Sequence, residues 1–228
     1  MKPHLKKQWS IGQITPEFLW EMETILHLYQ LPYDPMYPVV CIDERPCQLI
    51  DDIIAPIPMK LNTPKRQDHH YKRNGVASLF IAFEPLTGQR IVEVRYRRTK
   101  VDYAHFLNKV AQHYPNATQI RLVQDNLNTH TPSAFYQTFD ASKAFELTRL
   151  LDMCYTPKSA SWLNTVEIEL SVLSRQCLSR RIGQVSELQR QVNAWAEARN
   201  RKKVRVNWQF TLNHARHKFK RFYHNSHA

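Results

Sequence analysis

The sequence lacks the features that define several large classes of protein. Its 228 residues contain no apolar run near the roughly 20 residues of a membrane span, and no signal-peptide pattern opens the chain. No internal repeat and no low-complexity segment is present. Hydrophobic residues make up 43% of the chain and aromatic residues 11%, which excludes a disordered protein. We therefore expect a folded protein of one large or two small domains, with no membrane partner.

Cysteine pairs and acidic residues are also scarce. The four cysteines are scattered without a Cys-x-x-Cys pair, which favours reduced core thiols of a cytosolic protein over disulfides or a zinc site. Aspartate and glutamate number 20 against 32 lysines and arginines, so the net charge is +12. Such an excess indicates a polyanionic partner, and nucleic acid is favoured because no membrane-like amphipathic stretch occurs.

Two short apolar runs are each followed closely by an aspartate. Residues 39–42 lead to Asp43, and residues 120–123 lead to Asp125. Runs of this length and composition predict buried strands. A carboxylate at the carboxyl end of a buried strand is held rigidly, and α/β proteins often place their chemistry there. Alone, such an aspartate is equally well explained as the cap of a following helix.

The remaining elements complete an α/β pattern. A proline-rich linker is predicted at 31–38 and a surface loop at 55–75. Further strands are expected at 48–50, 76–83, 90–97 and 152–155, and helices at 16–29, 102–114, 132–139, 141–151, 165–177 and 184–200. This order predicts an α/β ribonuclease-H-like fold, a mixed sheet flanked by helices, in which parallel strands bring Asp43 and Asp125 side by side.

A third carboxylate is expected on the helix at 165–177. Glu167 and Glu169 flank its apolar stripe from opposite sides, so periodicity alone does not choose between them. Three converging carboxylates repel one another and require divalent cations. Oxygen ligands suit Mg²⁺ or Mn²⁺, and two such ions can activate a nucleophile and stabilise the leaving oxygen of a phosphodiester.

Several segments, taken together, resemble insertion-sequence transposases of the mariner superfamily. They are Cys41-Ile-Asp43-Glu44, Gln124-Asp125-Asn-Leu-Asn-Thr-His130, Tyr155-Thr-Pro-Lys158 and Trp162-Leu-Asn-Thr-Val-Glu167-Ile-Glu169. The likeness covers about residues 2–223. It implies that Asp43, Asp125 and Glu167 form a catalytic and metal-binding Asp-Asp-Glu triad for two Mg²⁺ (or Mn²⁺) ions. It further implies a DNA transposase that cuts transposon ends and joins the freed strand to target DNA.

The resemblance also sets expectations for organisation and partners. We expect a basic leader, helix and linker over residues 1–38, the catalytic domain over 39–200 and a basic aromatic tail over 201–228. Family members normally begin with helix-turn-helix domains, and 42 positions separate Asp125 from Glu167, more than in mariner relatives. We therefore expect a catalytic part that acts as a homodimer on inverted-repeat and target DNA, with a separately encoded helix-turn-helix subunit. A cytoplasmic, nucleoid-associated location follows from a DNA substrate.

Other residues are candidates for supporting roles. Glu44 is expected to be structural or to support the site from the opposite side of its strand. Phosphate and base contacts are candidates for Lys158 and Trp162, although a tryptophan is more often part of a core. His130 either orients a phosphate or the attacking water, or caps the following helix. Basic residues that open the tail are candidates for DNA contact, unless the tail is a solvated amphipathic helix: Arg201, Lys202 and Lys203.

Two alternative functions stay open on the sequence. One is a ribonuclease-H-like nuclease that cuts DNA without strand transfer. The other is a domesticated or inactive transposase-derived DNA-binding protein. The three intact carboxylates argue against the inactive form, because the fold alone does not require them together.

Overall fold

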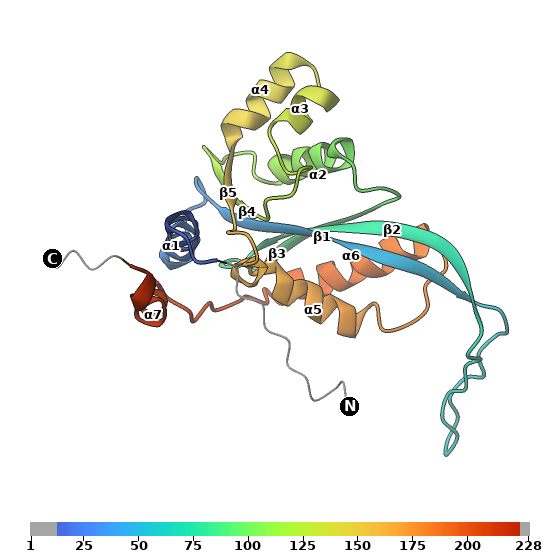
Figure 1. Ribbon diagram of the computed structural model, residues 1–228. Coiled ribbons are helices and arrows are strands. Elements are labelled where there is room, and N and C mark those ends of the chain that lie inside the picture. Colours follow the sequence, from blue (N-terminus) through green and yellow to red (C-terminus); the bar gives the residue numbers. More distant parts are fainter. Residues whose placement is uncertain (1–12, 224–228) are drawn as a thin grey trace.

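A mixed sheet of five strands forms the centre of the computed structural model, which describes residues 13–223 (Figure 1). The strand order is β3-β2-β1-β4-β5. Strands β1, β2 and β3 are antiparallel neighbours, whereas β4 and β5 run parallel to β1. Their bounds are β1 (Val39–Asp52), β2 (Tyr71–Glu84), β3 (Gln89–Arg95), β4 (Ile120–Gln124) and β5 (Leu151–Tyr155).

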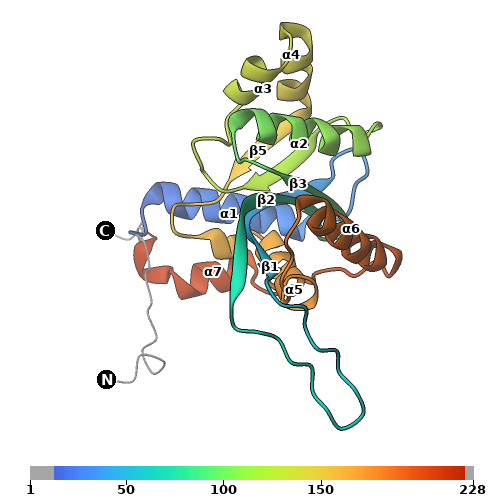
Figure 2. The same ribbon diagram turned by 90° about the vertical axis from the view of Figure 1, so that its right-hand side faces the viewer.

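Helices cover both faces of this sheet, as predicted. One face packs against α2 (Lys100–His113), α3 (Ser133–Thr138) and α4 (Ala141–Leu150). The other packs against α1 (Pro16–Gln30), α5 (Val166–Gln176), α6 (Val185–Arg201) and α7 (Leu212–Lys218). Short 3₁₀ turns lie at Ser161–Leu163 and Lys220–Phe222. Figure 2 shows the two helical layers on either side of the sheet.

Side-chain alternation assigns each strand residue to one of two cores. In β1, Cys41 belongs to the core beneath α5 and α6, whereas Val40 and Ile42 belong to the core beneath α2 to α4. In β4, Val123 belongs to the core beneath α5 and α6, and Leu122 belongs to the core beneath α2 to α4. Strands buried on both faces need a continuous apolar run, which explains why both segments were recognisable in the sequence.

Strand β1 differs from the prediction. The sequence predicted a strand that ends before Asp43 and a separate strand at 48–50. This prediction is wrong, because β1 is a single strand that continues to Asp52. Its pairing with β4 covers only Val39 to Cys41, but its pairing with β2 extends from Cys41 to Asp52. The continuation carries polar residues that no apolar pattern marks, and it is held by backbone hydrogen bonds to β2.

Beyond this paired region the two strands open into a projecting segment, residues 53–70, which we call the arm (Figure 1). It corresponds to most of the predicted surface loop, whose last residues belong to β2. Arg181 holds the base of the arm by donating hydrogen bonds to Asp52 and to the main-chain oxygens of Asp68 and His70, at 2.8 to 2.9 Å. The direction of the arm is thus tied to the loop after α5.

Both terminal segments of the described chain pack on the core beneath α5 and α6. Met22 and Ile25 of α1 are fully buried, and Phe18 meets Phe219 edge to face at 6.1 Å between ring centroids. Arg216 of α7 pairs with Glu23 of α1 at 2.6 Å. The predicted leader at residues 1–9 and the last residues of the tail lie outside the described part. No described helix has the length and apolar character needed to cross a membrane.

A buried ion pair connects three elements on this face. Glu169 of α5 lies 2.5 Å from the Arg90 Nε atom of β3 and 2.9 Å from the Arg199 Nη2 atom of α6. Arg90 also donates to the main-chain oxygens of Gly88 and Val204. Burial alone would raise the pKa of the Glu169 carboxyl, but the two guanidinium groups outweigh burial and lower it. Glu169 is therefore a structural anion.

We expect Glu169→Gln to lower the free energy of unfolding at pH 7 by about 3 kcal/mol, because it leaves two guanidinium groups without their buried partner. Because the pKa of Glu169 is lowered in the folded state, the stabilisation is complete above the ordinary carboxyl pKa. It is lost as the pH falls through the folded-state value. Urea denaturation at several pH values measures this difference.

The matched control is Glu197→Gln, on an exposed position of α6. Its free energy of unfolding should stay within about 0.5 kcal/mol of the parent. Equal stability of the two variants would contradict a structural role for the Glu169 ion pair.

Candidate active site

The register of the parallel pair β1 and β4 brings two aspartates together. Cys41 pairs with Val123, so Asp43 and Asp125 follow this pair by the same number of residues on adjacent strands. Asp43 lies two residues after Cys41 and Asp125 two residues after Val123, and both of these earlier residues face α5. Because side chains alternate along a strand, the two aspartates are expected on that same face. Both line one open pocket of about 620 Å³. The predicted convergence of these aspartates is what the fold produces.

Glu167 reaches the same pocket from the first turn of α5. The segment before α5 is anchored directly to β1, because Asn164 Nδ2 donates to the Ile42 main-chain oxygen at 2.8 Å. Thr165 Oγ1 likewise donates to the Cys41 sulfur at 3.0 Å. These contacts fix the start of α5 beside Asp43.

The two glutamates of α5 therefore have different surroundings. Glu167 is exposed to the pocket, whereas only 1% of Glu169 is exposed and its charge is taken up by two arginines. The helical periodicity that left the choice open in the sequence places them on different sides of α5. By geometry, Glu167 is the glutamate that faces the two aspartates.

The electrostatics of the pocket are unfavourable to a cluster of bare carboxylates. Burial, followed by the charges of Glu167, Glu44 and Asp125, raises the pKa of Asp43 to about 7. A hydrogen bond from the Glu44 main-chain nitrogen to Asp43 Oδ1, at 2.7 Å, opposes this rise but does not cancel it. Asp43 thus holds a proton more readily than an ordinary aspartate, and a bound cation would reverse this preference.

His130 is completely buried next to this cluster. Its Nε2 atom lies 2.9 Å from Glu44 Oε2, and its Nδ1 atom lies 2.6 Å from Asp125 Oδ1. Nδ1 is better aligned with the main-chain oxygen of Asp125, at 3.2 Å, so the 2.6 Å contact is an ion pair and not a linear hydrogen bond. Burial opposes a charge on the ring, but Asp125 and Glu44 outweigh it and raise the pKa of His130 to about 9.

The other predicted DNA contacts divide into near and distant residues. Lys158 and Trp162 are exposed on the segment between β5 and α5, which also contributes Ser161 and Asn164 to the pocket. His130 has no exposed surface. A basic run at the end of α6, of which Lys203 lies against the β2–β3 turn, does not line the pocket: Arg201, Lys202 and Lys203.

Three arginines at the pocket were missed by the sequence analysis. Arg45, Arg98 and Arg175 line it together with the carboxylates. Arg98 lies 3.6 Å from Glu44, with about half of its side chain exposed. The position of Arg45 two residues after Asp43 was the one signal available, because strand alternation gives the two residues the same face. Positive groups beside the carboxylates suit a phosphate-containing ligand.

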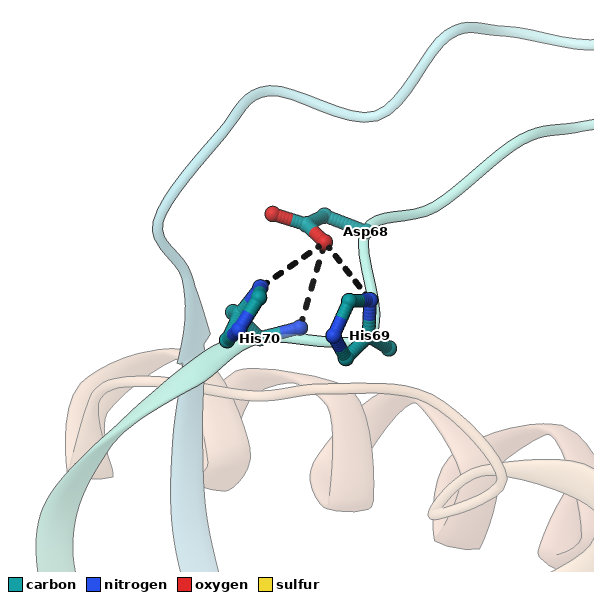
Figure 3. Close-up of side chains that lie close together, drawn as sticks. All are labelled: Asp68, His69 and His70. Carbon is teal, nitrogen blue, oxygen red and sulfur yellow. Dashed lines mark hydrogen bonds and ion pairs between the residues drawn. The ribbon is translucent and has the colours of Figure 1, made fainter.

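A separate His-Asp cluster lies at the base of the arm (Figure 3). The Nδ1 atoms of His69 and His70 lie 3.2 and 3.3 Å from Asp68 Oδ1, as hydrogen-bonding or ion-pair contacts. Both histidines are largely exposed, and Arg181 donates to the main-chain oxygens of Asp68 and His70. We assign no metal to this cluster, because a guanidinium group already lies against the three residues.

Comparison with known proteins places these observations in a family. The model of the DDE superfamily endonucleases matches residues 38–189. No curated relative matches the sequence.

Three solved structures are similar to the chain. The Mos1 mariner paired-end complex with Mn has a TM-score of 0.54 at 14% identity, covering 86% of this chain and 61% of that one. The Mos1 paired-end complex with the left transposon end has a TM-score of 0.53 at 14% identity, and the match covers 86% of this chain and 60% of that one. The Mos1 strand transfer complex has a TM-score of 0.54 at 12% identity, and the match covers 88% of this chain and 62% of that one. This chain thus spans about three fifths of the length of these transposases.

At such low identity the structural likeness establishes the fold, and the predicted ribonuclease-H-like mixed sheet flanked by helices is confirmed. The matched region extends over most of the chain and includes Asp43, Asp125 and Glu167. The expected resemblance to mariner-type transposases is likewise confirmed. This chain belongs to the DDE superfamily of endonucleases.

Proposed function

We propose that this chain is the catalytic part of a metal-dependent DNA transposase, which cuts transposon-end DNA and transfers the freed strand to target DNA. The observation that supports this most strongly is the convergence of three carboxylates from β1, the end of β4 and α5 in one open pocket. Those carboxylates are Asp43, Asp125 and Glu167. Arginines at the same pocket are suited to the phosphates of a DNA strand.

The donor set fits hard divalent cations. Asp43 has no cationic partner among the described residues, and burial together with the charges of Glu167, Glu44 and Asp125 raises its pKa. Asp125 has one such partner, the buried ring of His130, and also lines the open pocket. Carboxylate oxygens that are short of positive partners are the ligands Mg²⁺ and Mn²⁺ prefer. When bound, two such ions would supply the Lewis acidity that activates the nucleophile and stabilises the leaving oxygen of a phosphodiester.

Each carboxylate has a distinct role in this proposal. Asp43 belongs to β1 and lines the pocket together with both of the others, so it would be the ligand shared by both ions. Asp125 and Glu167 would each complete one ion site. Arg98 and Arg175 bind the phosphates next to the cleaved bond, and water or a 3′ hydroxyl enters from the open side of the pocket.

DNA beyond the cleaved bond is proposed to contact the segment between β5 and α5. Lys158 borders a second pocket of about 480 Å³ that includes Asn126, the neighbour of Asp125. Trp162 is 44% exposed and packs edge to face on Phe210, so one part of its ring remains available for a base. More distant contacts by Arg201, Lys202 and Lys203 would require DNA to extend around the β2–β3 turn.

The proposal extends to partners and location. We infer that a homodimer holds two DNA ends in the active complex, and that a separately encoded helix-turn-helix subunit supplies recognition of the inverted repeats. A DNA substrate fits the expected cytoplasmic, nucleoid-associated location. A nuclease without strand transfer, or a DNA-binding protein without cleavage, is distinguished by the products of the first assay below.

The first prediction concerns cleavage. With Mg²⁺ or Mn²⁺, the chain should nick DNA carrying the inverted repeats of its own element and join the 3′ end to a target plasmid, whereas Ca²⁺ should not support nicking. Glu167→Gln keeps the size of the side chain but removes its charge, so the nicking rate should fall by several orders of magnitude. Gel analysis of labelled ends measures nicking and joining separately.

The control for this assay is Glu197→Gln, which should remain within about tenfold of the parent, or roughly 1.4 kcal/mol of barrier. Nicking without joined product would replace the transposase by a nuclease. Nicking by Glu167→Gln at the parent rate would refute the assignment of the third carboxylate.

The second prediction concerns the protein without metal. The pKa of Asp43 is raised from 3.8 to about 7 in the folded state, so ionisation of this group opposes folding. Stability from its retained proton is complete below pH 4 and is lost as the pH rises through about 7. Asp43→Asn should therefore melt at a higher temperature than the parent in chelator at pH 8, with the difference vanishing toward pH 4.

Differential scanning fluorimetry in EDTA measures both melting temperatures. The comparison variant is Asp140→Asn, which changes an aspartate outside the pocket, at the cap of α4. It should melt at or below the temperature of the parent throughout this pH range. A lower melting temperature for Asp43→Asn at pH 8 would contradict uncompensated charge in the pocket.

The third prediction concerns binding to DNA. With a net charge of +12 and no recognition domain in the described residues, contacts to phosphates should dominate. Affinity should fall steeply with salt concentration, with the same slope for inverted-repeat and random duplexes. Fluorescence anisotropy at several salt concentrations tests this. Tight binding to one sequence that is insensitive to salt would overturn it.

A further inference from the structure

The residue next to the first catalytic aspartate points to the other face of the sheet. Asp43 and Glu44 are consecutive in β1, so their side chains leave the strand in opposite directions. Asp43 faces α5, whereas Glu44 contacts His130, whose ring is stacked on Tyr103 of α2 at 4.7 Å between centroids. Glu44 nevertheless also lines the pocket that holds Asp43, and His130 connects it to Asp125.

On this basis, and given the proposed function, we propose that Glu44 and His130 form a buried bridge that positions the carboxylate of Asp125 for metal binding. Glu44 holds one ring nitrogen of His130 at 2.9 and 3.1 Å through its two oxygens. The other ring nitrogen lies 2.6 Å from Asp125 Oδ1. His130 touches no reacting atom in this arrangement and acts through Asp125.

Asp125 needs such support because β4 ends one residue before it. Asp125 therefore lies outside the ladder of β-sheet hydrogen bonds, at the start of a turn. Among residues 13–223, His130 is the one side chain in ion-pair or hydrogen-bonding contact with Asp125. Without it the carboxylate would be free to rotate away from the pocket.

The bridge is itself held firmly. Tyr155 of β5 donates a hydrogen bond to the His130 main-chain oxygen at 2.7 Å, and the His130 main-chain nitrogen donates to Leu127 at 2.9 Å. The ring of His130 is completely buried, and the Glu44 side chain is only 2% exposed. A buried carboxylate and imidazole are costly unless each finds a partner, so this pair is locked in one arrangement.

The outer end of the bridge, Glu44, also reaches the pocket. Arg98, which lines the pocket, lies 3.6 Å from Glu44 Oε1. One continuous series of charged groups therefore runs from Arg98 through Glu44 and His130 to Asp125. Removing a partner that orients a metal ligand typically lowers metal affinity about 10–100-fold.

Two substitutions of His130 test the two contacts of its ring separately. His130→Asn places an amide nitrogen near the position of Nδ1, so it keeps a donor toward Asp125 and loses Glu44. His130→Gln places the amide near the position of Nε2, so it keeps Glu44 and loses Asp125. The bridge predicts that His130→Gln binds Mn²⁺ about 10–100-fold more weakly than the parent, whereas His130→Asn retains more of the affinity.

Mn²⁺ binding to the full chain without DNA is measured by the electron paramagnetic resonance signal of free Mn²⁺. Nicking is then assayed as a function of Mn²⁺ concentration. His130→Gln should require more Mn²⁺ for its half-maximal rate and recover part of the rate when Mn²⁺ is in excess. A purely structural role would lower the folded fraction without moving this midpoint. Glu44→Gln leaves the ring in place and gives the same test if either histidine variant fails to fold, with an expected shift in the same direction.

His113→Gln, at an exposed position of α2, is the control and should bind Mn²⁺ like the parent. Asp125→Asn separates the two levels of inference. If Asp125→Asn binds Mn²⁺ as well as the parent, the proposed metal site is wrong. If Asp125→Asn weakens Mn²⁺ binding but His130→Gln and Glu44→Gln do not, the site stands and the bridge is refuted.

Discussion

The structure depends on how short the parallel pairing of β1 and β4 is. These strands share a register over only Val39 to Cys41 and then separate, while β1 continues along β2. Asp43 and Asp125 stand where the strands part, so the sheet holds both aspartates but leaves open space between them and α5. A longer parallel ladder would fill this space with backbone, and a shorter one would leave the aspartates without a common frame.

Neighbouring acidic residues have opposite fates around this point. Glu169 is neutralised by Arg90 and Arg199, and Glu44 by His130, so both of these buried carboxylates have partners within the protein. Asp43 has no such cation among the described side chains, and burial together with the charges of Glu167, Glu44 and Asp125 raises its pKa. The protein thus supplies a positive partner to Glu169 and to Glu44, whereas Asp43 faces the open pocket without one.

The sequence predicted those features that depend on local pattern. Apolar runs revealed β4 and the start of β1, and helical periodicity revealed α1, α5 and α6 within a few residues. What it did not predict depends on partners distant in the chain. Glu169 is 79 positions from Arg90, and His130 is 86 positions from Glu44. The residues that neighbour Glu169 and His130 in the sequence therefore did not predict that either side chain is buried in an ion pair. The family resemblance selected Glu167, and the ion pair of Glu169 supplies the physical reason for that choice.

The continuity of β1 links the position of Asp43 to that of the arm. Asp43 and the base of the arm belong to the same strand, and β2 is paired with that strand between them except for a register shift at Leu49 and Ile50. Arg181 and the close approach of Gly183 to Asp51 fix the far end of this two-stranded ribbon to the loop after α5. Asp43 and the arm therefore belong to one two-stranded ribbon whose far end is anchored, so the course of β1 sets the orientation of both together.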